Sequence, residues 1–484
     1  MHAVVALLSV HKIKALMCTS VAGQKGISME EQFLLKQYSK AISSLQPHFS
    51  AKSNASVRVA LITCVLFVCI ELTLGHYRTG NTHLRHGLKL LGYLQANSRL
   101  SSEQEVFVLG PFPQTLDEWI TETFMRLLFH AGPFRQCPEL FQHIVPPETA
   151  IDLFKAMSQA RQCLDRLFMR IFGLVEECRQ EWLACGVVTS LGLFDRQRRL
   201  KGDLDVWLRN YEVYDKTRIQ LASLRERIEY QLLLSYHTMA SIMTQTALWP
   251  GCEMRYDAQS ADFALLIEQT INVVRTLWST GSVEMRHGDE DRGEEMRESF
   301  PDLGWVPPLY YTIVKCRDHR LRSQALKLLN DNSHKETMWD AKLAASVCQA
   351  VMDVEEQDFY SGMIEADENP MSSMPAEECV AILPVLPHTH RMHEVQVVLP
   401  NDTTEGTKLF CKRREDDGRW YILECVLSPR TRSPSVWIEK IGVPTGVDSA
   451  PRESLGETDS RTENLPNGQD GQKRYAVAGV YRGV

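Results

Sequence analysis

The stretch SVRVALITCVLFVCIELTLGHYRTGNTHLRHGLKLLGYL, residues 56–94, changes its hydrophobic pattern half way along. The first half is almost continuously apolar, which is typical of a buried helix. In the second half leucines recur every three or four residues with charged residues between them, so one helix face is apolar and the other polar. Gly75 separates the halves, where a helix end favours a residue that tolerates a left-handed conformation. The stretch therefore predicts a helical hairpin that forms part of the core.

The apolar half of this hairpin raises the alternative of a membrane span. A helix that crosses a bilayer needs about 20 predominantly apolar residues. Arg58 and Glu71 bound the apolar run, and the stretch between them is shorter than that. We therefore expect a buried core helix. Gly80 and Gly87 lie on or near the second helix, where the lack of a side chain would let two helices approach closely.

The composition is that of an ordinary globular protein. The chain has 484 residues, of which 44% are hydrophobic and 24% charged, and its net charge is −8. An isoelectric point near 6.0 argues against an extended basic surface that binds nucleic acid by itself. The 13 cysteines are scattered and include no CxxC pair, which favours reduced, buried thiols in an intracellular protein. The N-terminal residues predict an amphipathic helix rather than a signal peptide.

The chain as a whole predicts a mainly α fold: an array of helical hairpins with a small C-terminal antiparallel β element and a disordered tail. Residues 1–360 are expected to form the helical domain. Its helices are expected at residues 1–20, from a Ser28–Glu31 capping box to Pro47, and at 116–128, 149–185, two within 195–249, 261–278, 309–314, 320–329 and 339–354. The charged segment 284–298 predicts a solvated loop, with an acidic contact surface for a partner as the alternative.

The pattern changes from helical to alternating after Pro387. Residues 361–386 are expected to be a linker, and residues 387–428 a small β element, which we expect to have three strands. Within this element Asp416-Asp417-Gly418 predicts a hairpin turn. Residues 429–484 are rich in small and polar residues, so we expect a largely disordered tail, above all at 443–474.

Sequence motifs for catalysis are absent. The chain has no phosphate-binding loop, dinucleotide fingerprint, nucleophile elbow, zinc-protease motif or calcium loop. We therefore expect no enzyme activity, no catalytic residue and no cofactor, and cofactor-binding residues stay unassigned. An enzyme whose active site is assembled from distant residues in the helical body is the alternative, because such a site leaves no local motif.

Three histidines, His388, His390 and His393, could together bind a metal. A zinc site also needs a rigid scaffold and usually a fourth ligand, so we interpret them as solvated side chains and expect no metal. His83 and His86 are three residues apart on the predicted amphipathic helix and are expected at its polar boundary.

Other polar motifs have structural interpretations. Cys178 and Cys185 are separated as two cysteines of a fungal zinc cluster are, but the preceding CxxC is missing, so core cysteines are expected. Lys412-Arg413-Arg414 falls in an expected strand. A second basic cluster contains Arg196, Arg198, Arg199 and Lys201, and we interpret it as the solvated end of a helix.

Several segments in a fixed order carry a family resemblance. They are HAVVALLSVHK (2–12), EQFLLKQYSKAISSLQ (31–46), LITCVLFVCIELTLGHYRTGNTHLRHGLKLL (61–91), VPPLYYTIVKCRDHRLRSQALKLL (306–329), KETMWDAKLAASV (335–347) and RMHEVQVVL (391–399). Together they resemble the regulatory region of fungal transcription factors of the binuclear zinc-cluster (six-cysteine) family. The resemblance covers residues 1–428, and the family's six-cysteine DNA-binding domain has no counterpart in these residues.

The resemblance implies a helical scaffold that controls transcription in the nucleus, or in both nucleus and cytoplasm. It implies protein partners from the transcriptional machinery or a DNA-binding factor, a small-molecule effector as a further candidate, and no direct nucleic-acid or membrane contact. Family members often control specialised metabolism. The alternatives are a pathway enzyme, a small-molecule sensor, and a truncated gene model of a DNA-binding activator.

Overall fold

The computed structural model describes residues 1–17, 29–50, 53–98, 107–108, 113, 115–132, 144–145, 151–218, 223–279, 304–331, 335–336, 339–361, 383–442 apart from 403, 417, 430, 432 and 436, and 474–475. Most of the described residues are helical. Twelve α-helices lie in this part of the chain: α1 (His2–Met17), α2 (Met29–Ser50), α3 (Asn54–Leu74), α4 (Tyr77–Ser98), α5 (Leu116–Ala131), α6 (Met157–Cys185), α7 (Leu191–Arg218), α8 (Leu224–Thr246), α9 (Ser260–Ser279), α10 (Val306–Lys315), α11 (His319–Asp331) and α12 (Ala341–Glu356).

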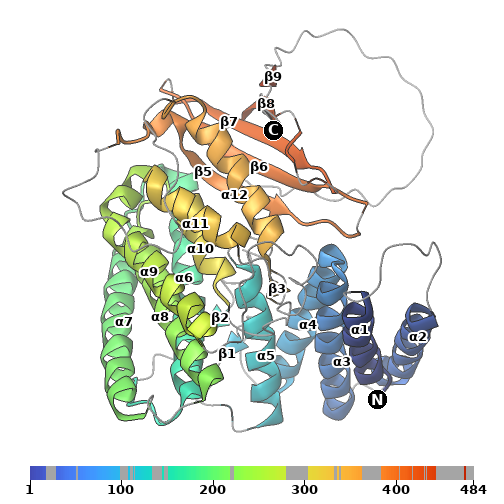
Figure 1. Cartoon of the computed structure of the whole chain (residues 1–484). Helices are drawn as coiled ribbons and strands as arrows, with labels where there is room; N and C mark the ends of the chain where they lie inside the picture. The colour runs from blue at the N-terminus through green and yellow to red at the C-terminus, as the bar shows by residue number, and fades with distance from the viewer. Residues whose placement is uncertain are drawn as a thin grey trace.

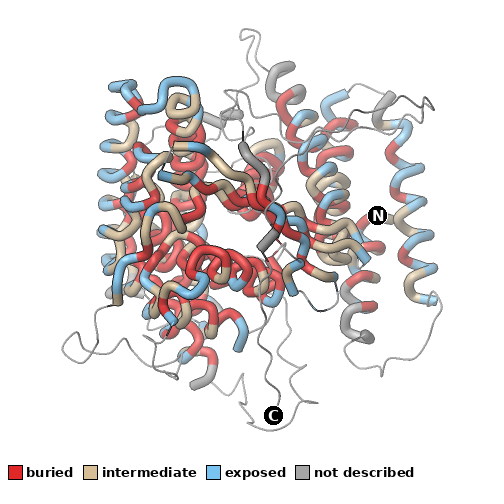
Figure 2. Tube along the Cα trace, turned by 90° about the horizontal axis from the view of Figure 1, so that it is seen from above, coloured by how far each residue is buried: buried red, intermediate tan, exposed pale blue. Residues whose placement is uncertain are grey.

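The helices form a body with a β-sheet across its top (Figure 1). Helices α1–α4 lie on one side, α6–α9 lie on the other, and α5 stands between the two groups. One large hydrophobic cluster runs from the hairpin through α5–α12 into the sheet, and a smaller one joins α1, α2 and α3. Seen from above, buried residues are concentrated in the middle of the body, and α2 lies at its margin (Figure 2).

The predicted hairpin is confirmed. Helices α3 and α4 are joined at Gly75, which has φ +88°, and its N–H caps the end of α3. A Cβ added to Gly87 would lie 2.3 Å from the ring of Phe124 on α5 and 2.8 Å from the sulfur of Cys64 on α3. Gly87 therefore allows α4 to pack closely against both helices.

The length argument against a membrane span was wrong. Helix α3 has 21 residues, and among the described residues it is the one helix long and apolar enough to cross a bilayer. The same composition is found in core helices of soluble proteins. Here α3 packs against α1, α2, α4 and α5, and its buried residues include Leu61, Val68 and Ile70.

Several helix boundaries differ from the sequence expectation by a few residues, and three of them have consequences for the argument. Helix α2 continues through Pro47 to Ser50; a proline in the last turn removes one hydrogen bond without ending the helix there. Helix α6 begins at Met157 rather than at 149. Helix α12 begins at Ala341, because Asp340 caps it by accepting a hydrogen bond from the backbone N–H of Leu343.

The C-terminal sheet has more strands than the expected three. Its order is β5-β6-β7-β8-β9, and all four strand pairs are antiparallel. The strands are β5 (Met392–Val398), β6 (Thr407–Arg414), β7 (Trp420–Leu427), β8 (Trp437–Gly442) and β9 (Arg474–Tyr475). The predicted turn between β6 and β7 is confirmed, with Gly418 at φ +81°. Strand β8 lies inside the expected tail because Trp437, which is fully buried, anchors it to the core.

Two minor sheets complete the described elements: β1 (Phe107–Val108) pairs with β2 (Ile144–Val145), and β3 (Lys335–Glu336) with β4 (Trp339–Asp340). The Ser28 of the expected capping box, the acidic segment 284–298, most of the linker 361–386 and the tail segment 443–473 lie outside the described residues.

Candidate functional site

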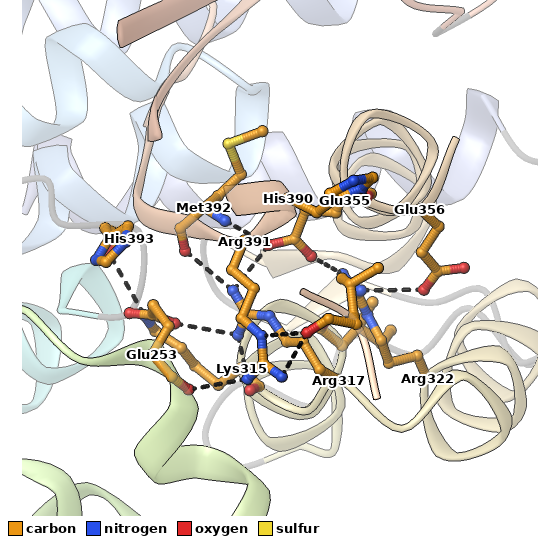
Figure 3. Close-up of polar contacts among 12 residues, drawn as sticks. Glu253, Lys315, Arg317, Arg322, Glu355, Glu356, His390, Arg391, Met392 and His393 are labelled. Atoms are coloured by element: carbon orange, nitrogen blue, oxygen red, sulfur yellow. Dashed lines mark hydrogen bonds and ion pairs between the residues drawn. The ribbon is translucent and has the colours of Figure 1, made fainter. Parts of the chain in front are cut away.

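Eight charged side chains meet where the first strand of the sheet crosses the helical body. We call them the junction cluster: Glu253 and Asp257 from the 3-10 helix η3 (Glu253–Gln259), Lys315 at the end of α10, Arg317, Arg322 on α11, Glu355 and Glu356 at the end of α12, and Arg391 just before β5. Figure 3 shows seven of them labelled and their contacts to the backbone at the start of β5.

Glu355 lies at the centre of this cluster and is fully buried. One of its carboxylate oxygens forms an ion pair with Arg317 at 2.8 Å, and the other forms an ion pair with Arg322 at 2.7 Å. The backbone N–H of Met392, the first residue of β5, also donates to Glu355 at 2.6 Å. Arg317 in turn donates to the carbonyl oxygen of Met392 at 3.0 Å. One carboxylate and one guanidinium thus bind the first residue of the sheet through its backbone.

Arg322 ties α11 to its two neighbours. Its guanidinium donates to the carbonyl oxygen of Ile313 in α10 at 2.8 Å and to Glu356 in α12 at 3.0 Å. The second oxygen of Glu356 lies 2.6 Å from Nδ1 of His319. Both Arg322 and Glu355 have no exposed side-chain surface, so these contacts are desolvated.

The remaining two acidic side chains, those of Glu253 and Asp257, also form ion pairs within the cluster. Glu253 pairs with Lys315 at 2.8 Å and with Arg317 at 3.1 Å. Asp257 forms a bidentate ion pair with Arg391, with N–O distances of 2.7 and 2.9 Å. Two parallel hydrogen bonds of this kind are stronger than a single one. Arg391 also donates to the carbonyl oxygen of Leu386, so the chain that enters the sheet is held on both sides.

The electrostatics of the cluster indicate a structural role. Four basic and four acidic side chains balance in formal charge. Burial alone would raise the pKa of the Glu355 carboxyl, but Arg317 and Arg322 lower it below its ordinary value. Burial would lower the pKa of Lys315, yet the Glu253 carboxylate raises it. Both shifts favour the charged forms of Glu355 and Lys315, so the ion pairs of the cluster join helices to sheet.

The three histidines considered as metal ligands do not share one binding point. His388 is exposed and pairs with Asp416 at 3.1 Å. His390 Nδ1 lies 2.9 Å from the carbonyl oxygen of Glu355. His393 is partly buried, so its interpretation as a solvated side chain was wrong. It packs edge-on against Trp420, and burial lowers its pKa to about 4. Among the described residues, no group of three or more His, Cys, Asp or Glu side chains could hold a metal ion.

The histidines of the hairpin have separate surroundings. His83 is half-buried beside Tyr38, whose hydroxyl donates to Glu71 at 2.6 Å, and burial lowers the pKa of His83. His86 is exposed. Glu71, expected to bound the apolar run, is buried and also lies 2.8 Å from Nδ1 of His76. This arrangement ties α2, α3 and α4 together.

The cysteine and basic motifs also occupy structural positions. Cys178 is buried in α6 and its pKa is raised to about 12 by burial, so its expected core position is confirmed. Cys185 is exposed at the end of α6, so the expectation of a core position was wrong for this residue. Lys412 and Arg413 lie in β6 and pair with Glu394 and Glu439. The basic cluster at residues 196–201 lies within α7.

Sequence reasoning missed the junction cluster. Its acids and bases come from five segments, and Arg391 and Asp257 are 134 residues apart. A local signal was present: Glu355 and Glu356 end a strongly apolar helix, and Arg317 and Arg322 follow an equally apolar one. Charged residues beside such runs often form buried pairs, but the sequence does not show which partners meet.

The comparisons with known proteins give one distant relative. The chain is 20% identical over 421 residues to the "Aspercryptin biosynthesis cluster-specific transcription regulator atnN" of Emericella nidulans, a match that covers 72% of this chain and 67% of that protein. No protein-family profile matches the chain. No solved structure matches it either. The similarity to a fungal transcription regulator agrees with the resemblance found in the sequence.

Proposed function

We propose that this protein regulates transcription of a fungal gene cluster for specialised metabolism and is not an enzyme. The observation that carries the proposal is the similarity to a cluster-specific transcription regulator over 72% of the chain. The match extends over 421 aligned residues, far beyond any single motif. The name states the role of the relative. We transfer this role to the present chain as a hypothesis.

The described structure supports a scaffold rather than a reaction centre. Its most elaborate polar site, the junction cluster, is balanced in charge and binds backbone groups of β5. Cys64 and Cys163 are partly buried and Cys316 is buried. Desolvation raises the pKa of each of these thiols to about 12, so they are protonated and poorly nucleophilic at neutral pH. Such a helical body is suited to bind other proteins.

The finer parts of the proposal concern place and partners. A transcription regulator acts in the nucleus, and we propose that location for this chain. The net charge of the whole chain is −8, which argues against an extended basic surface that binds DNA by itself. We propose that it acts through protein partners, either a DNA-binding factor or the transcriptional machinery, and that a small-molecule effector is an additional input.

A reporter assay tests the proposal. The full chain is fused to a heterologous DNA-binding domain in a filamentous fungus, and transcription of a reporter with the matching operator is measured. We expect a several-fold change relative to the DNA-binding domain alone. Deletion of the gene in its own host should change transcript levels of a linked group of biosynthetic genes. A fusion without effect on the reporter, together with unchanged transcripts in the deletion strain, would contradict the proposal.

A further inference from the structure

The loop between β7 and β8 contains a short symmetric sequence. Residues 428–434 read SPRTRSP, so a Ser-Pro pair stands at each end and two arginines lie between the pairs. The chain has 21 prolines, and only Pro429 and Pro434 directly follow a serine or a threonine. Both Ser-Pro pairs of the whole sequence therefore fall in this one loop.

Ser433 is the more accessible of the two serines. It is exposed, and its hydroxyl lies 2.6 Å from the hydroxyl of Thr431, which is exposed as well. Its backbone carbonyl oxygen accepts a hydrogen bond from the N–H of Ser428 at 2.9 Å, which closes the loop. Ser428 is only partly exposed. A second protein can therefore reach the hydroxyl of Ser433 more easily than that of Ser428.

The loop can open without disturbing the sheet. Its base is held by an isolated bridge between Leu427 and Pro434 and by the backbone N–H of Ser435, which donates to the carbonyl oxygen of Val426 at 2.9 Å. The regular ladder of β7 and β8 lies further along the hairpin. A proline has no N–H with which to extend such a ladder. Residues 428–435 can therefore adopt an extended conformation in another protein while β7 and β8 stay paired.

We infer that Ser433 is phosphorylated by a proline-directed protein kinase. Kinases of this class require a proline directly after the acceptor serine, and Pro434 occupies that position. Arg430 and Arg432 lie three residues and one residue before Ser433. Charge patterns around the acceptor contribute to kinase specificity, and two arginines complement an acidic substrate groove. The proline, the arginines and the exposed hydroxyl thus occur together at one position.

The modification changes the charge of the loop. Oγ of Ser433 attacks the γ-phosphorus of ATP, the bond from that phosphorus to the β-phosphate oxygen breaks, and ADP leaves while the hydroxyl proton passes to a base of the kinase. Residues 428–434 contain two arginines and no acid, a formal charge of +2. The phosphate adds about −1.5 to −2 at neutral pH, so the loop becomes nearly neutral. Arginine forms strong charge-assisted hydrogen bonds with phosphate, and two arginines lie within three residues of Ser433.

The neighbouring hydroxyls are poorer acceptors. Ser428 precedes a proline but is partly buried, whereas Thr431 and Ser435 are exposed but are not followed by a proline. Ser433 meets both conditions. Trp437, four residues further on, is fully buried and anchors β8, so a phosphate on the exposed loop should leave the packing of the sheet unchanged.

The test is phosphate transfer to the purified full chain. The chain is incubated with radiolabelled Mg-ATP and a purified cyclin-dependent or mitogen-activated kinase, and the modified residue is identified by tandem mass spectrometry. Ser433→Ala should lose most of the incorporated phosphate. Pro434→Ala keeps the acceptor hydroxyl and should lose most of it too. Thr431→Ala is the matched control, because it removes the adjacent exposed hydroxyl and should keep the incorporation. Circular dichroism and thermal unfolding establish that each variant is folded.

A second measurement examines the chain isolated from its own host. The peptide that contains Ser433 should carry phosphate there. The inference is overturned by equal incorporation into Ser433→Ala and the unchanged chain, by equal incorporation into Pro434→Ala and the unchanged chain, or by a Ser433 peptide from the host that carries no phosphate. The inference does not rest on the proposed function. A chain phosphorylated at Ser433 that drives no reporter contradicts the proposed function alone, and a chain that drives the reporter without this phosphate contradicts the modification alone.

Discussion

The side-chain oxygen of Asn401 accepts hydrogen bonds from both the backbone N–H and the hydroxyl of Thr79, at 3.0 and 2.9 Å, although 322 residues separate the two. Asn401 lies in the loop between β5 and β6, and Thr79 lies in the first turn of α4. The loop therefore satisfies one of the free N–H groups that every helix start leaves unpaired. An ion pair between Arg78 and Glu405 at 2.7 Å supports the same contact. The sheet is thus attached to the N-terminal hairpin as well as to the junction cluster.

Replacing Asn401 by alanine should loosen the start of α4. The loss of a capping acceptor costs about 1 kcal/mol, which corresponds to about a fivefold change in local opening. Hydrogen exchange of the Thr79 amide should accelerate by that factor. Gln396→Ala, at an exposed position of β5, is the control and should leave this amide unchanged. Equal exchange in the two variants would show that the loop does not cap α4.

Replacing Arg322 by methionine should destabilise the protein strongly. The change leaves Glu355 without one of its two cations in a fully buried site, and removing one partner of a buried pair costs about 3–5 kcal/mol. Arg198→Met is the matched control, because the pair of Arg198 with Asp195 is largely exposed and contributes less than about 1 kcal/mol. The measurement is the free energy of unfolding in urea. Similar values for the two variants would refute the role assigned to the cluster.

Adding a methyl group at Gly87 should also destabilise the protein. The new Cβ of Gly87→Ala would overlap the ring of Phe124, and overpacking of this kind costs about 1–3 kcal/mol. Gly202→Ala on α7 makes the same chemical change where no atom lies within 4 Å. There the helix propensity of alanine should stabilise the protein by about 0.5–1 kcal/mol. Thermal unfolding should therefore shift in opposite directions for the two variants.

The protonation of His393 should destabilise the protein at a pH above the range in which most carboxylates of the protein are protonated. The unfolded imidazole binds a proton near pH 6.5, whereas the folded one binds it near pH 4 because burial disfavours its charged form. Between these values the unfolded chain holds more protons, so stability falls as the pH falls from 6.5 to 4. The full difference corresponds to about 3 kcal/mol.

His393→Phe removes this titration and keeps the contact with Trp420. Its free energy of unfolding should fall less between pH 7 and pH 4.5 than that of the unchanged chain. His388→Phe changes an exposed histidine and should keep the steeper dependence. Identical pH profiles for the His393 variant and the unchanged chain would contradict the assignment.

The hairpin, most helices and the β6–β7 turn were predictable because each depends on local patterns. Gly75 and Gly418 mark turns through their own backbone freedom, and the leucines of α4 repeat within one helix. Strand β8 was missed because Val436-Trp437-Ile438 is a short apolar run between polar segments, and the burial of Trp437 in the core is decided by the tertiary fold. The junction cluster was missed for a different reason: which acid meets which base is decided by the tertiary fold.

The junction cluster has a consequence for the order of folding. Strands β5 to β8 are neighbours in both sequence and space, so each pair closes a short loop. The pair of Arg391 with Asp257 closes a loop of 134 residues. Short loops close at a lower entropic cost, so the sheet forms early and docking onto the helices is a late event. Substitutions in the cluster should consequently accelerate unfolding and leave the folding rate nearly unchanged. The lifetime of the native state, rather than the speed of reaching it, then depends on these eight side chains.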